Sequence, residues 1–117
     1  MRSFALLFAF VCSAFAYTVD VPNGEQGWQS FGPQLLKWSR VDTDSSTFAV
    51  VLTNQDRTIL PRDVFIGRDV DGTRLATWVH SHRERFPTGD HFRVNLVRDH
   101  NDPNTIFAQS SEFSIYY

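Results

Sequence analysis

Short runs in which apolar and polar residues alternate constrain the fold of this chain more than any other feature. Phe92, Val94 and Leu96 alternate with Arg93 and Asn95, which places the apolar side chains on one face of a strand. Such runs recur between clusters of Gly, Pro, Asn and Asp, and no segment keeps a sustained helical period. The expected strands lie at 17–21, 35–40, 47–54, 63–70, 74–80, 91–98, 105–109 and 112–117. The pattern predicts an all-β domain.

About seven short strands in one domain predict two antiparallel sheets packed face to face, with a small closed barrel as the alternative. Asp71-Gly72 is typical of a hairpin between neighbouring strands. Ser110-Ser111 interrupts the last expected strand, so that 105–117 is either one broken strand or two. The alternation predicts a core that comprises Leu36, Trp38, Phe48, Val50, Leu52, Phe92, Val94, Leu96, Phe113 and Ile115.

Residues 1–16 have the pattern of a secretory signal peptide. Arg2 precedes an apolar run from Phe4 to Val11, and Ala14-Phe15-Ala16 is an A-x-A cleavage signature. The apolar run is too short to span a bilayer. We therefore expect residues 17–117 to be a single secreted domain, extracellular or in the cell wall, with no membrane segment after signal cleavage.

The only cysteine, Cys12, lies in this leader, so the exported domain is expected to have no disulfide and to depend on its apolar core.

The charge balance argues against a nucleic-acid partner. The chain has eleven Lys and Arg against thirteen Asp and Glu, and loss of Arg2 with the leader gives a net charge of −3. Phosphate backbones and anionic lipids are bound by basic surfaces, which this composition does not supply.

Four segments together resemble a known family. Gly27–Asp44 reads G-W-x-S-x-G-P-x-x-x-x-W-x-R-V-D-T-D, and Phe48–Asn54 reads F-x-V-V-L-x-N. Phe92–Asp99 reads F-R-V-N-L-V-R-D, and Asn104–Phe113 reads N-T-I-x-A-Q-S-x-x-F. In this order they resemble the fungal cell-wall-synthesis N-terminal domain of the KRE/KNH family, in its small secreted form.

The resemblance implies an immunoglobulin/fibronectin-III-like β-sandwich at the fungal cell wall, linked to β-1,6-glucan organisation and without a catalytic centre. Many relatives continue into a Ser/Thr-rich region with a lipid-anchor signal. The sequence stops at Tyr117 without either, which favours a freely secreted form.

The three tryptophans have different expected roles. Trp38 alternates with Leu36 and is expected in the core. Trp28 follows a glycine in a loop, where it either covers the core or offers a flat ring to a sugar. Trp78 shares its strand face with His80, which predicts an exposed carbohydrate platform; the alternative is a core contact under the following loop. Trp78, Trp28 and His80 are therefore the candidate carbohydrate-binding residues.

No metal or other cofactor is expected. His80-x-His82 has a spacing that some metal sites use, but loop histidines are more often solvated. The acidic pairs Asp42/Asp44, Asp69/Asp71 and Asp99/Asp102 are interpreted as turn-forming residues. The alternative is a polysaccharide-active enzyme that uses two opposed carboxylates. Its candidate residues are Asp42, Asp44, Asp69, Asp71 and Asp99.

The outward Arg93 and Arg98 are expected to pair with nearby carboxylates, and recognition of acidic sugars or partner carboxylates is the alternative. The leading hypothesis is a non-catalytic secreted module that binds cell-wall polysaccharide or wall proteins. The enzyme above and a module that binds a partner protein through an exposed sheet edge are the other two hypotheses.

Overall fold

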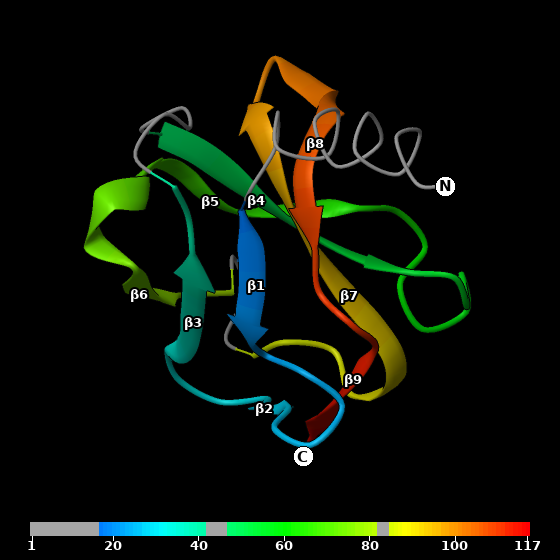
Figure 1. Cartoon of the computed structure of the whole chain (residues 1–117). Coiled ribbons are helices and arrows are strands. Elements are labelled where there is room, and N and C mark those ends of the chain that lie inside the picture. The colour runs from blue at the N-terminus through cyan, green and yellow to red at the C-terminus, as the bar shows by residue number, and fades with distance from the viewer. Residues whose placement is uncertain (1–16, 42–46, 82–84) are drawn as a thin grey trace, which may run out of the picture.

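The computed structural model describes residues 17–41, 47–81 and 85–117, and this part of the chain is all-β (Figure 1). The expected leader, Asp42, Asp44 and His82 lie outside the described residues. The three-stranded sheet has the order β1-β3-β6 and comprises β1 (Thr18–Val21), β3 (Gln34–Ser39) and β6 (Ala76–Val79). The six-stranded sheet has the order β2-β9-β7-β4-β5, with β8 also paired to β7. It comprises β2 (Trp28–Gln29), β4 (Thr47–Asn54), β5 (Val64–Asp71), β7 (Gly89–Asp99), β8 (Asp102–Gln109) and β9 (Phe113–Tyr116).

The two sheets close on a shared apolar core, as the alternation predicts. Every residue of the expected core is buried. Trp38 of β3 lies edge-on to Phe48 of β4, with ring centroids 5.0 Å apart. Its indole N–H donates to the buried carbonyl of Gly72 at 2.8 Å. The ring therefore fills the space between the sheets while its one polar atom is satisfied.

Strand β4 is buried on both faces, although the alternation predicts one buried face. Ala49 and Val51 form a second small cluster with Val97 of β7, and Phe65 of β5 packs against it. β4 lies between β5 and β7, so neighbouring side chains cover its outer face as well.

The predicted hairpin at Asp71-Gly72 is wrong. β6 pairs with β3 in the other sheet and not with β5. Asp71 caps a short 3-10 turn, η1 (Gly72–Arg74), and Leu75 adopts a left-handed conformation with φ 68°. These two features turn the chain across the sandwich, and the backbone N–H of Trp38 donates to the Leu75 carbonyl at 3.1 Å.

Strands β8 and β9 follow each other along the same partner strand, β7, and are separated at Ser110. β8 and β9 both pair antiparallel with β7. Between them, Ser110 N donates to Val94 O at 2.9 Å, and Val94 N donates to the Ser110 hydroxyl at 3.0 Å. The serine side chain thus completes the hydrogen bonding where the strand is interrupted.

Strand β2 departs from the expected antiparallel arrangement, because it pairs in parallel with β9 (Figure 1). The approach is close at Gly27, where a Cβ would lie 2.1 Å from the Ser114 carbonyl oxygen. Because of β2, and because β8 and β9 are separate, the described residues form nine strands, where the pattern predicts about seven.

Candidate functional site

Trp78 presents its ring to solvent on the outer face of the three-stranded sheet. It lies in β6 opposite Leu35 of β3, and its side chain is 60% exposed. The adjacent Val79 points inward and is buried, as alternation along a strand requires. Within the described residues, the Trp78 ring stacks on no other aromatic ring. Its face is therefore available to a ligand.

A groove of about 370 Å³ runs beside this ring, between β5 and β6. These strands are edges of different sheets, so no ladder of hydrogen bonds closes the space between them. β5 carries an extra residue opposite β4, between the pairs Val50–Gly67 and Phe48–Val70, and Asp69 has a φ of 49°. This bulge bends the strand. The groove is lined by polar side chains that include Arg68, Asp69, Asp71, Arg74 and His80.

One oxygen of the Asp71 carboxylate, Oδ1, holds the η1 turn. It accepts hydrogen bonds from the Thr73 hydroxyl at 2.6 Å and from the Thr73 backbone N–H at 3.0 Å. These bonds, the hydroxyl first, lower the pKa of Asp71 from its ordinary value of 3.8. At neutral pH the group is an ionised hydrogen-bond acceptor at the groove wall.

The carbohydrate-platform interpretation of Trp28 does not fit its position. The side chain is only 2% exposed and packs against Phe86 and Phe113, with ring centroids at 5.4 and 5.1 Å. Its indole N–H donates to the Leu35 carbonyl at 2.8 Å. The chain between β1 and β3 crosses to β9, and this crossing carries Trp28 into the core. Of the three candidates, Trp78 and His80 line one groove and Trp28 does not.

The acidic pair Asp99 and Asp102 also stabilises local turns. Asp99 accepts from the backbone N–H of Asn101 at 2.8 Å, and Asp102 accepts from the Thr105 hydroxyl at 2.8 Å. Among residues 17–41, 47–81 and 85–117, no three His, Cys, Asp or Glu side chains come together as a metal would require.

An aromatic cluster that the sequence did not indicate lies at the end of the sandwich near the C-terminus. The backbones of Phe31 and Arg85 form an isolated antiparallel β-bridge. The Arg85 guanidinium lies 4.7 Å from the centroid of the Phe31 ring and 5.4 Å from the centroid of the Tyr117 ring. Tyr117 is 80% exposed. Here the rings hold each other and a cation, whereas the ring of Trp78 has no such partner among the described residues.

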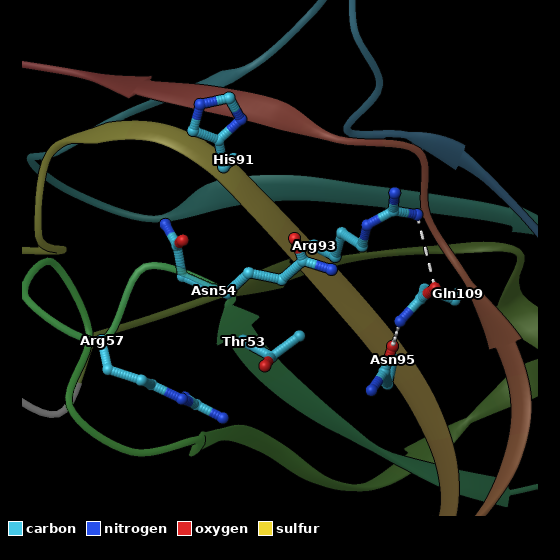
Figure 2. A pocket seen from close by; sticks show the side chains of 8 residues that line it. Thr53, Asn54, Arg57, His91, Arg93, Asn95 and Gln109 are labelled. Atoms are coloured by element: carbon cyan, nitrogen blue, oxygen red, sulfur yellow. Dashed lines mark hydrogen bonds between the residues drawn. The ribbon is translucent and has the colours of Figure 1, made fainter.

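A second hollow, of about 300 Å³, lies on the outer face of the six-stranded sheet (Figure 2). Figure 2 shows Arg57 extending from the β4–β5 loop toward Thr53, while Arg93 leans from β7 toward Gln109. The hollow is lined by Thr53, Asn54, Gln55, Arg57, His91, Arg93, Asn95 and Gln109. The sequence indicated only that Arg93 and Asn95 point outward.

No helix in the described part of the chain is long and apolar enough to cross a membrane. The chain is similar to a protein of the fission yeast Schizosaccharomyces pombe that is described as uncharacterized. The two are 29% identical over 108 residues, which is 92% of this chain and 29% of the yeast protein. The chain thus spans less than a third of that relative. No family model and no solved structure matches the chain.

Proposed function

We propose that this domain is a non-catalytic secreted module of the fungal cell wall that binds β-glucan through the groove beside Trp78. The exposed Trp78 ring carries the proposal, because a flat apolar ring beside polar groups is the arrangement that suits a sugar. The groove supplies donors and acceptors for hydroxyl groups from Arg68, Asp69 and His80. Participation in β-1,6-glucan organisation rests on the family resemblance of the sequence.

The sandwich that carries this groove is proposed to be of the immunoglobulin/fibronectin-III type. The order β1-β3-β6 in one sheet supports it, as do the central positions of β4 and β7 in the other. In this arrangement the groove opens between β5 and β6, which are edge strands of different sheets.

The Asp71 carboxylate of the groove favours binding over hydrolysis. A glycosidase needs one carboxyl group with a raised pKa that donates a proton to the leaving oxygen. The pKa of Asp71 is shifted in the opposite direction by its hydrogen bonds to Thr73. Asp71 is therefore suited to accept hydrogen bonds from sugar hydroxyls and unsuited to general-acid catalysis.

Retention of the protein on insoluble β-1,3- and β-1,6-glucan tests the proposal. Trp78→Ala is expected to weaken retention about thirty-fold, since loss of a tryptophan that anchors an interface costs about 2 kcal/mol. Tyr117→Ala is the matched control, because it removes a more exposed aromatic ring outside the groove. Trp78→Phe keeps a ring and should retain part of the binding.

Two results would contradict the proposal. One is a wild-type protein that passes through every glucan without retention. The other is an equal loss of retention in the Trp78 and Tyr117 variants. Release of reducing ends above a boiled control would support the enzyme hypothesis in place of a binding module.

A further inference from the structure

The hollow on the outer face of the six-stranded sheet has an unusual set of charges for this chain. Arg57, Arg93 and His91 line it together with uncharged Thr, Asn and Gln side chains, and no carboxylate lines it. The whole chain carries more acidic than basic residues, with a formal net charge of −2. Basic groups are thus gathered in a concave place on a protein that is acidic overall, which favours an anionic ligand.

Arg93 is held in a fixed orientation. Its guanidinium donates to the Gln109 side-chain oxygen at 3.3 Å and to the Ser110 carbonyl at 3.4 Å. Gln109 in turn donates to the Asn95 side-chain oxygen at 2.8 Å (Figure 2). A guanidinium has five N–H donors, so these bonds orient the group without using it up. An oriented arginine can bind a carboxylate through two parallel hydrogen bonds.

Each arginine of the hollow also lies near a carboxylate outside the lining. Arg57 lies 3.0 Å from Asp63, and Glu112 lies 3.7 Å from Arg93 and 3.2 Å from His91. The Arg57–Asp63 and Arg93–Glu112 ion pairs are partly exposed to solvent, and pairs of this kind contribute about 0–1 kcal/mol. A ligand carboxylate can therefore share or replace them at small cost.

We infer that this hollow binds an acidic sugar through its carboxylate. The Arg93 guanidinium holds the carboxylate, the amides of Asn95 and Gln109 bond to hydroxyl groups of the ring, and Arg57 adds positive charge from the opposite side of the hollow (Figure 2). The volume of about 300 Å³ is at the small end of the range for small-molecule sites, which suits one sugar unit. The lining contains no Phe, Tyr or Trp ring, so a neutral glucan lacks the broad stacking surface that the Trp78 groove offers.

Titration with three small probes, followed by NMR, tests this inference. Glucuronate carries both the carboxylate and the hydroxylated ring, glucose carries only the ring, and acetate carries only the carboxylate. Glucuronate is expected to bind at least about five-fold more tightly than either of the others, because charge-assisted hydrogen bonds add to those of the hydroxyls. Its shifted amide signals should come from β4, β7 and β8.

Variants separate the hollow from general charge attraction. Arg57→Gln and Arg93→Gln are each expected to weaken glucuronate binding at least about five-fold. Arg98→Gln removes the same charge from the same strand as Arg93, but outside the hollow, and should leave binding unchanged. Trp78→Ala should also leave it unchanged, so failure of the glucan proposal is distinguishable from failure of this one.

Three results would overturn the inference. Glucose that binds as tightly as glucuronate would remove the role of the arginines, and acetate that binds as tightly would remove the role of the sugar ring. An equal loss in Arg98→Gln and Arg57→Gln would assign the binding to net charge alone. Arg57 is exposed on a loop, so its variant tests the site even if the Arg93 variant is unstable.

Discussion

Replacement of Gly27 by alanine tests whether the close contact between the chain at β2 and strand β9 stabilises the fold. A Cβ at this position would lie 2.1 Å from the carbonyl oxygen of Ser114. It would also lie 3.1 Å from the carbonyl carbon and 3.3 Å from the backbone nitrogen of the same residue. All three atoms belong to the backbone of β9, which cannot move aside as a flexible side chain can. β2 must therefore separate from β9 in the variant.

The cost of that separation follows from what β2 holds in place. Trp28 would move away from Phe113, and the 2.8 Å hydrogen bond from Ser30 N to Tyr116 O would lengthen. Overpacking of this kind costs about 1–3 kcal/mol, and the lost bond adds about 1 kcal/mol. We expect Gly27→Ala to lower the free energy of unfolding by about 3 kcal/mol, or roughly 10–20 °C in melting temperature.

Urea unfolding followed by tryptophan fluorescence measures this change, since Trp28 and Trp38 are buried and report on the core. Gly24→Ala is the matched control in the same loop. A Cβ at Gly24 would meet only the Glu112 carbonyl oxygen, at 3.5 Å, which is an ordinary contact. That variant should stay within about 0.5 kcal/mol of the wild type. Equal stabilities of the two variants would refute the steric reasoning.

Three further predictions concern single side chains. Trp38→Phe leaves the buried Gly72 carbonyl without its donor and should lower the free energy of unfolding by about 2–4 kcal/mol in urea; a change below about 0.5 kcal/mol would contradict the role given to that bond. The folded-state pKa of Asp71 is depressed by Thr73, so its stabilisation is present above the ordinary value of 3.8 and lost as pH falls below it. Asp71→Asn should therefore lose less stability than the wild type between pH 5 and pH 2, and parallel pH profiles would argue against the shift. Trp78→Ala should change stability by less than about 0.5 kcal/mol by thermal melting, because the ring is exposed; a larger loss would indicate that the ring supports the fold.

The sequence predicted one part of the candidate groove and missed the other. Alternation along 74–80 placed Trp78 and His80 on the outer face; Trp78 lies there in β6, and His80, which follows the strand, lines the same groove. Arg68, Asp69 and Arg74 could not be assigned to the same groove, because their positions depend on the bulge in β5 and on the turn that carries the chain to the other sheet. A local pattern contains no information on either.

Alternation by itself determined which side chains point inward and where most of the strands lie, because successive residues of a strand face opposite sides wherever the strand is placed. Tertiary structure alone decided which strands become neighbours. The chain crosses from one sheet to the other after Asp71-Gly72, where the local pattern predicted a hairpin, and Trp28 is buried against β9. Tertiary structure also placed Arg57 of the β4–β5 loop and Arg93 of β7 at the same hollow. These outcomes depend on contacts between residues far apart in the chain, and such contacts form only when both sheets close on one core.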